Sequence, residues 1–265
     1  MKPKPAHLGP KFGAQFADRS VAESYETRNP YPPGLFDTLL QLSCGLPNPI
    51  LDLGCGTGDI ALGIASRSTR LICGVDPSEA MLEFARSRGE RENVSNVRWF
   101  HDSAETFDFG GPYSLVVAGE SLHWMEWDLV VPKIASSLSR DAHLVVVDGR
   151  EFRDPPWKAD LLAILPHYST NQQFRPYDLI EELTSRKLFH EIGRETIIGD
   201  SISQSVDDYI ESFHTRNGFS RERMAPDQAK AFDSEVRSLL GPYENEQMVS
   251  GVTTSRVVWG LPISV

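Results

Sequence analysis

The segment ILDLGCGTGD at residues 50–59 constrains the fold of this chain more than any other part of its sequence. It begins as a short apolar strand that ends at Leu53. The turn that follows contains Gly54, Gly56 and Gly58. Glycine adopts positive φ and brings the backbone close to a ligand without a Cβ clash. Because a helix expected from about residue 59 would point its free N–H groups at the same crevice, the segment predicts a ligand-binding strand–turn–helix unit.

Short apolar runs alternate with amphipathic segments from this point onward. The runs are 50–53, 71–75, 97–100, 114–118 and 143–147, and the candidate helices between them are 59–67, 77–88 and 126–138. Continuous apolar strands separated by helices are typical of a parallel sheet that is buried on both faces. The pattern therefore predicts the α/β class with a doubly wound sheet.

The flanks of this core have a looser pattern. Residues 1–16 are rich in Pro, Gly and Lys, and we expect them to form a mobile or loosely docked arm. A helix is expected at 18–28, and the sequence NPYPP breaks it before a second helix. After residue 148 the expected elements are a Pro-bounded segment at 154–176, helices at 177–188, 206–215 and 226–240, and strands at 195–202 and 253–259. We interpret 205–225 as a cap on the carboxyl edge of the sheet.

Composition excludes several classes of partner. The 265 residues include 37 acids and 26 bases, for a net charge of −11, which disfavours nucleic acid. The three cysteines show no CxxC spacing, so neither a disulfide framework nor a metal site is indicated. The apolar runs are far shorter than the roughly 20 residues of a membrane span, and the N-terminus lacks the apolar segment of a signal peptide. We expect a cytoplasmic protein with no membrane partner.

The spacing of the glycines argues against a dinucleotide. In the GxGxxG fingerprint the third glycine would fall at position 59, which is Asp59. Asp52 stands two residues before Gly54, and a carboxylate there would repel a pyrophosphate but attract an ammonium or sulfonium group. An NAD-linked oxidoreductase is therefore the less favoured alternative.

An acid follows the second predicted strand at the position where a ribose is often bound. Asp76 ends the sequence GVD, and its carboxylate can accept hydrogen bonds from both ribose hydroxyls. The same residues also form a helix start, in which Asp76 or Ser78 is the N-cap and Pro77 is the first helical residue. Both roles remain open at this point.

These segments resemble the class I S-adenosylmethionine-dependent methyltransferases, within the small-molecule branch of trans-aconitate-type (type 11) enzymes. The resemblance is carried by ILDLGCGTG, GVDPSEAML, Ser103-Ala104-Glu105 and AGESLHW, and more thinly by YETRNPYPPGL and DDYIESFHTRNGF. It implies one domain over 1–265 with a seven-stranded Rossmann-like sheet. Its expected parts are an N-terminal arm and helices at 1–48, a cofactor core at 49–150, a small helical cap at 205–225 and a final antiparallel strand at 252–261.

The resemblance also implies S-adenosyl-L-methionine as cofactor, S-adenosyl-L-homocysteine as product and no metal. The methionine moiety would lie beside Gly54, Cys55 and Gly56, with Asp52 orienting that turn or reaching the amino group. The nucleoside would contact Asp76, Pro77, Met81, Asp102, Ser103 and Ala104. Ser103 stands where relatives usually have an acid, so the adenine amine could be held by Ser103 or Asp102. Gly119 and Glu120 would lie near the sulfonium, and Tyr25 would cover the cofactor.

Few residues are candidates for the chemistry itself. His123 follows the fourth strand and is the first candidate for a general base, although His123 and Trp124 together also suit a structural pair. The acceptor side has four substrate candidates: Tyr31, Trp124, His214 and Arg216. The guanidinium of Arg216 would suit a carboxylate, whereas a solvated position on the cap is the alternative for Arg216 and His214.

The sequence therefore predicts methyl transfer to a small organic acceptor by a monomer or homodimer. The alternative is a cofactor-binding regulatory or scaffold protein that keeps the methyltransferase fold with little turnover.

Overall fold

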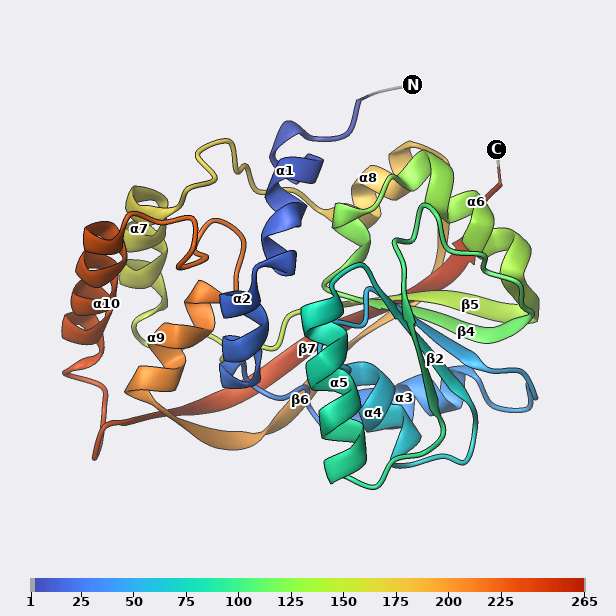
Figure 1. Ribbon diagram of the computed structural model, residues 1–265, viewed down its shortest axis with the longest axis horizontal. Coiled ribbons are helices and arrows are strands. Elements are labelled where there is room, and N and C mark those ends of the chain that lie inside the picture. The colour runs from blue at the N-terminus through green and yellow to red at the C-terminus, as the bar shows by residue number, and fades with distance from the viewer. Residues whose placement is uncertain (1–2, 265) are drawn as a thin grey trace.

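The computed structural model describes residues 3–264, in which seven strands form one mixed sheet (Figure 1). The strand order is β3-β2-β1-β4-β5-β7-β6. The bounds are β1 (Ile50–Leu53), β2 (Ile72–Asp76), β3 (Val97–His101), β4 (Tyr113–Gly119), β5 (Leu138–Asp148), β6 (Phe189–Ser205) and β7 (Met248–Pro262). Strands β1 to β5 are parallel, and β7 runs antiparallel to both β5 and β6. The predicted doubly wound, seven-stranded sheet is confirmed; residues 1, 2 and 265 of the predicted domain lie outside the described part.

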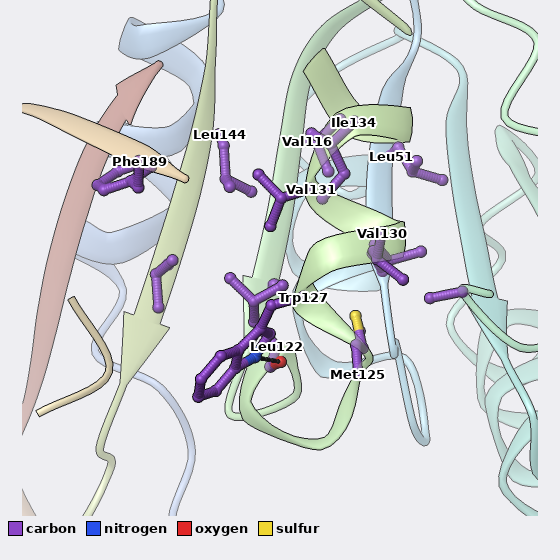
Figure 2. Close-up of a cluster of buried hydrophobic side chains, with 14 of the residues drawn as sticks. Leu51, Val116, Leu122, Met125, Trp127, Val130, Val131, Ile134, Leu144 and Phe189 are labelled. Atoms are coloured by element: carbon purple, nitrogen blue, oxygen red, sulfur yellow. Dashed lines mark hydrogen bonds between the residues drawn. The ribbon is translucent and has the colours of Figure 1, made fainter. Parts of the chain in front are cut away.

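Helices cover both faces of the sheet because the central strands alternate their buried side chains between two apolar clusters. On one face Leu51 and Leu53 of β1 pack in the cluster that contains α6 (Trp127–Ser137) and α8 (Leu179–Ser185). Figure 2 shows α6 on this face, where the indole Nε1 of Trp127 donates a hydrogen bond to the carbonyl oxygen of Leu122, at 2.8 Å. On the other face Ile50 packs in the cluster of α3 (Gly34–Leu42) and α4 (Asp59–Ala65).

The strands β6 and β7 form a long antiparallel pair that extends beyond the rest of the sheet, and the chain between them contains α9 (Val206–His214) and α10 (Pro226–Leu240). The far end of this pair carries α7 (Lys158–Tyr168), α9 and α10, which share a third apolar cluster (Figure 1). We call these three helices the helical layer. The predicted cap at 205–225 is therefore part of a larger unit, since Ile164 of α7 and Phe232 of α10 pack in the same cluster as Phe213 of α9.

The N-terminal segment is more ordered than the predicted mobile arm. Its described residues form η1 (Ala6–Leu8), α1 (Pro10–Gly13) and η2 (Ala14–Ala17), followed by α2 (Arg19–Ser24) and η3 (Tyr25–Thr27). The segment is held down because its carbonyls accept side-chain hydrogen bonds: Asn171 Nδ2 donates to the His7 oxygen at 3.2 Å, and Asn217 Nδ2 to the Phe12 oxygen at 2.8 Å. In Figure 1 α1 and α2 lie between the helical layer and the sheet.

Two further elements complete the described fold, α5 (Glu79–Arg91) and the short η4 (Leu122–Trp124). None of the helices within residues 3–264 has the length and apolar character needed to cross a membrane.

The helical layer should depend on the ring of Phe232, which is fully buried and lies 5.2 Å from the ring of Phe219, centroid to centroid. Phe232→Ala leaves a cavity and should lower the free energy of unfolding by about 3–5 kcal/mol. Leu129→Ala on α6 is the control, because that side chain is 47% exposed and its loss should cost no more than about 0.5 kcal/mol. Urea denaturation measures both, and equal losses would contradict the assignment.

Candidate active site

A cavity of about 1200 Å³ opens at the carboxyl ends of the parallel strands. Its lining comes from the turns after β1 to β4, from the N-terminal segment, from the helical layer and from the loop at 169–177. The crevice outside the carboxyl ends of the strands is where doubly wound sheets bind ligands. The cavity therefore lies where the sequence predicts the site.

The turn after β1 is compatible only with small residues. Gly54 has a φ of 74°, and a Cβ added there would lie 2.5 Å from the Cβ of Ser121. Ser121 is itself fixed, since its hydroxyl donates to the carbonyl oxygen of Leu53 at 2.6 Å. A Cβ at Gly56 would lie 3.8 Å from the nearest ring atom of Tyr25. Gly54 and Gly56 thus line the cavity without side chains of their own, and the ring of Tyr25 packs beside Gly56.

Asp76 lines the cavity, and two backbone N–H groups fix the position of its carboxylate. One oxygen accepts from the N–H of Gly56 and the other from the N–H of Ser78, each at 2.8 Å. Burial raises the pKa of Asp76 to about 6, against the lowering effect of these two N–H groups. The Ser78 hydroxyl accepts from the N–H of Met81, so Ser78 is the N-cap of α5. Asp76 remains available to hydroxyl donors in the cavity, because each carboxylate oxygen can accept more than one hydrogen bond.

The turn after β3 closes the same end of the cavity. Ser103 and Ala104 line it together with Asp102, whose Oδ1 accepts from the N–H of Ser103 at 2.8 Å and from the Thr106 hydroxyl. The predicted nucleoside contacts that line the cavity are Asp76, Pro77, Met81, Asp102, Ser103 and Ala104. Thr106 was not predicted, although its place three residues after Ser103 is a common capping spacing.

Two predicted cofactor contacts lie behind the turn and do not line the cavity. Asp52 is 1% exposed, and its Oδ2 accepts from the N–H of Ala61 in α4, at 2.9 Å. Burial raises the pKa of Asp52 to about 8, so this carboxyl holds its proton at neutral pH. The side chain of Cys55 is also buried, and burial raises the pKa of its thiol. Asp52 thus fastens α4 to the strand, because the alternation of β1 turns it away from the cavity.

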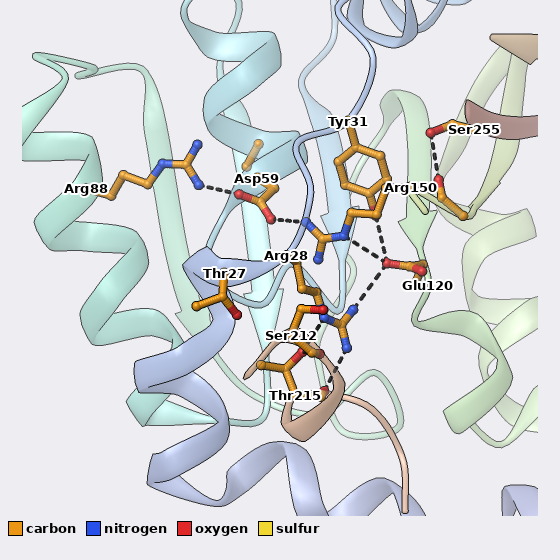
Figure 3. Close-up of polar contacts among 12 residues, drawn as sticks. Thr27, Arg28, Tyr31, Asp59, Arg88, Glu120, Arg150, Ser212, Thr215 and Ser255 are labelled. Atoms are coloured by element: carbon orange, nitrogen blue, oxygen red, sulfur yellow. Dashed lines mark hydrogen bonds and ion pairs between the residues drawn. The ribbon is translucent and has the colours of Figure 1, made fainter. Parts of the chain in front are cut away.

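A buried network of charges joins the sheet to the N-terminal segment (Figure 3). The guanidinium of Arg150 pairs with Asp59 at 2.6 Å and with Glu120 at 3.3 Å. Asp59 also pairs with Arg88. The hydroxyl of Tyr31 donates to Glu120 at 3.4 Å. Tyr31 is therefore part of this network and lies outside the cavity lining, whereas Glu120 and Gly119 line the cavity as predicted.

Arg28 extends the network to the helical layer. It pairs with Glu120 at 3.3 Å, and it donates from Nε to the Thr215 hydroxyl and from Nη2 to the Thr215 carbonyl, both at 2.7 Å (Figure 3). The guanidinium carbon of Arg28 lies 4.4 Å from the ring centroid of Tyr25, and that of Arg150 at 5.2 Å. Sequence reasoning missed Arg28 and Arg150. The only available signal was their position, within YETRNPYPP and directly after β5.

His123 lines the cavity after β4, with its ring 4.7 Å from that of Trp124, which also lines it. Burial, followed by the nearby charges of Lys4 and Arg28, lowers the pKa of His123 to about 3. The imidazole is therefore neutral at pH 7 and a weak proton acceptor. A role for His123 as general base stays a prediction, and the contact with Trp124 fits the structural alternative.

The two candidates on the helical layer have different environments. Arg216 lines the cavity, pairs with Glu151 at 3.5 Å and lies 4.1 Å above the ring centroid of Phe213. His214 is 2% exposed and lies outside the lining. Its Nδ1 contacts the Phe219 carbonyl at 2.8 Å and its Nε2 contacts Asp233 at 2.7 Å. His214 therefore has a structural place in the layer, and Arg216 is the residue that can meet a ligand.

Within the Pro-bounded segment at 154–176, Arg175 lines the cavity. His167 and Tyr168 do not, and the Tyr168 hydroxyl donates to Glu235 at 2.6 Å. Within residues 3–264 no group of His, Cys, Asp and Glu side chains is arranged to hold a metal ion.

Residues 50–141 match the model of a protein family described as a methyltransferase domain. Among curated proteins, the probable S-adenosylmethionine-dependent methyltransferase CRG1 of Saccharomyces cerevisiae is 27% identical over 142 residues, which cover 52% of this chain and 46% of that protein. The ubiquinone biosynthesis O-methyltransferase of Neisseria meningitidis serogroup C is 32% identical over 103 residues, 39% of this chain and 42% of that protein. The chain thus spans less than half the length of these two relatives.

Solved structures resemble nearly the whole chain. A putative type II methyltransferase from Anaeromyxobacter dehalogenans has a TM-score of 0.60 at 20% identity, covering 89% of this chain and 99% of that one. The YcgJ protein of Bacillus subtilis has a TM-score of 0.52 at 19% identity, covering 87% and 97%. The predicted class I methyltransferase fold is therefore confirmed.

The buried carboxyl of Asp52 should make stability depend on pH. Unfolding restores the ordinary pKa of this carboxyl, about 4. At any pH between about 4 and about 8 the chain therefore releases this proton when it unfolds. The stabilisation that depends on this proton is complete below about pH 4 and is lost as the pH rises to about 8. Asp52→Asn keeps an acceptor for Ala61 and cannot ionise. Its free energy of unfolding should therefore gain on the wild type by up to about 1.4 kcal/mol per pH unit across this window.

Denaturation at about pH 5 and about pH 8 measures this difference. The exposed Asp200→Asn is the control, and its difference from the wild type should be the same at both pH values. Parallel pH profiles of Asp52→Asn and the wild type would show that Asp52 is ionised in the folded protein.

Proposed function

Because residues 50–141 match a methyltransferase domain model and the chain has the class I methyltransferase fold, we propose that it transfers a methyl group from S-adenosyl-L-methionine to a small organic acceptor. The observation that carries the proposal is the shared cavity. The glycine turn, the Asp76 carboxylate, the Ser103-Ala104 turn and Glu120 all line it, so groups suited to a nucleoside and to an amino acid share one cavity.

The chemistry of the lining fits such a cofactor. The carboxylate of the buried Asp76 is positioned by the N–H groups of Gly56 and Ser78 and lines the cavity. It can therefore accept hydrogen bonds from the hydroxyl groups of a ribose. Gly54 and Gly56 line the cavity without side chains, which leaves room for the thioether chain. Glu120 and Arg28 line the cavity as an ion pair, and the carboxylate of Glu120 can accept a further hydrogen bond from an ammonium group. The remaining nucleoside contacts that we propose are Pro77, Met81, Asp102, Ser103 and Ala104.

When bound, the cofactor supplies a methyl group on a positively charged sulfur. The neutral thioether that remains after the transfer is a good leaving group. The protein then has to align an acceptor and keep water out. Tyr25 covers the glycine turn on one side, and Phe213 and Arg216 line the cavity on the other. A neutral His123 can accept a hydrogen bond from the acceptor, and its low pKa favours acceptors that need not give it a proton.

The size and class of the acceptor are part of the proposal. A relative named for ubiquinone biosynthesis O-methylation supports a small organic acceptor. The net charge of −11 argues against nucleic acid. A single domain, a cytoplasmic location and a monomeric or homodimeric state stay predictions.

Titration calorimetry with S-adenosylmethionine and S-adenosylhomocysteine tests the proposal first. A mass-spectrometric screen of organic acceptors for the gain of one methyl group then tests turnover. Binding of both compounds together with a methylated product is the expected result. Binding without transfer to any acceptor would favour the regulatory alternative, and failure to bind either compound would contradict the proposed function.

The role of Asp76 can be tested separately by substitution and pH. Asp76→Ala should weaken cofactor binding by about 1.5–3 kcal/mol, the range for hydrogen bonds to a charged group. In the wild type the ionised fraction of Asp76 falls below about pH 6, so affinity should be constant above that pH and fall by up to about tenfold per unit below it.

Calorimetry at several pH values gives both quantities, and the exposed Asp200→Asn is the matched control. Asp76→Asn should lose the pH dependence as well as affinity. Unchanged affinity in Asp76→Ala would remove Asp76 from the cofactor site.

A further inference from the structure

The cavity is larger than one ligand requires. Ligand sites usually enclose about 300–1000 Å³, and this cavity has about 1200 Å³. The residues proposed to hold the cofactor line only the part beside the strand ends. The remainder extends between the N-terminal segment and the helical layer. We call this remainder the acceptor lobe, defined by Leu8, Leu162, Leu165, Phe174, Phe213 and Phe219.

Two of the six apolar side chains of the acceptor lobe are exposed, whereas Leu8, Phe213 and Phe219 are buried. Leu162 on α7 is 57% exposed, and Phe174 in the loop at 169–177 is 54% exposed. In Figure 1 this loop crosses from α7 toward α8 beside α1. When a ligand covers large apolar side chains on a cavity wall, binding is stabilised by about 25 cal/mol for each Å² of apolar surface that is buried. The lobe therefore favours an apolar ligand.

The polar side chains around the acceptor lobe are used to assemble its walls. Asn171 Nδ2 donates to Asn217 Oδ1 at 2.6 Å and to the His7 carbonyl at 3.2 Å. Gln172 Nε2 donates to the Ser169 carbonyl at 2.6 Å. These bonds join the loop, the end of α9 and the N-terminal segment. They hold the walls together. Oδ1 of Asn171 and Nε2 of His7 are buried without a hydrogen-bond partner, but both are neutral polar atoms, because burial lowers the pKa of His7, and they offer no charge to a ligand with many charges.

The two arginines near the lobe differ in how far their donors are already used within the protein. Arg175 donates from Nη1 to the Phe174 carbonyl at 2.6 Å, and so binds its own loop. Arg216 makes a long ion pair with Glu151, at 3.5 Å, over the ring of Phe213. A guanidinium has five N–H donors, and this ion pair uses few of them. Arg216 thus provides one polar recognition point at the inner edge of an apolar lobe.

We propose that the acceptor has an apolar body, aromatic or aliphatic, that fills the acceptor lobe, and one polar end that lies beside Arg216. This inference rests on the proposed methyl transfer and narrows its substrate class. A small polyacid does not fit, because its several charges would face Leu162, Phe174 and Phe219.

Calorimetry with straight-chain monocarboxylates, from butanoate to decanoate, tests this on the full chain saturated with S-adenosylhomocysteine. The carboxylate serves as the polar end and the alkyl chain as the apolar body. Affinity should rise about two- to fourfold for each added methylene group until the lobe is filled, because each one leaves water. Affinity that is independent of chain length would overturn the proposal, as would tighter binding of propane-1,2,3-tricarboxylate than of decanoate.

Leu162→Ser and Phe174→Ser locate the effect, and both side chains are exposed enough to be replaced without loss of the fold. Each should weaken decanoate binding about three- to tenfold and leave butanoate binding unchanged. Leu129→Ser is the matched control, since Leu129 is an exposed leucine outside the cavity lining and its loss should change neither. Decanoate affinity that is unchanged in both lobe variants would also overturn the proposal.

Binding of S-adenosylhomocysteine is measured first in every sample. Should it fail in the wild type, the proposed function is contradicted, and the same carboxylate series on the chain alone still decides the preference of the lobe. Should it succeed while the series is flat, only the acceptor class is wrong.

Discussion

The buried guanidinium of Arg150 holds together parts of the chain that are far apart in sequence. It follows β5 and pairs with Asp59 at the start of α4 and with Glu120 after β4. Through Glu120 it is joined to Arg28 of the N-terminal segment, and through Arg28 to Thr215 at the end of α9. Because a buried charge without a partner is costly, these groups must assemble together. The network therefore fixes the walls of the cavity relative to the sheet.

The core of the site could be predicted because its signals are local. A strand followed by alternating glycines requires a turn without side chains, and the φ of 74° at Gly54 with Ser121 packed against it is the physical reason. The acid at the end of β2 lines the same cavity, since parallel strands end at one edge of the sheet. The helix start was left open between Asp76 and Ser78, and the hydrogen bond from the N–H of Met81 assigns the cap to Ser78.

The remainder depends on contacts between distant segments, which no local pattern encodes. Pro and Gly near the N-terminus suggested a mobile arm, yet Asn171 and Asn217 bind its carbonyls from more than 160 residues away. Asp52 is predicted to orient the glycine turn or to reach an amino group, and its place in a buried strand directs it to the N–H of Ala61 and raises the pKa of its carboxyl to about 8. The sequence makes His214 a candidate for the acceptor site or for a solvated position on the cap, whereas its ring is buried in the helical layer beside Asp233.

The two ends of the cavity are built from different stretches of the chain. The family match ends at residue 141, and the cavity walls formed by Asp76 and by residues 102–104 fall within it. The walls of the acceptor lobe come from before residue 50 and after residue 157, outside the match. The family match therefore includes residues at one end of the cavity and none of the six residues that define the acceptor lobe. The side chains of the acceptor lobe can therefore change between proteins without altering the matched core.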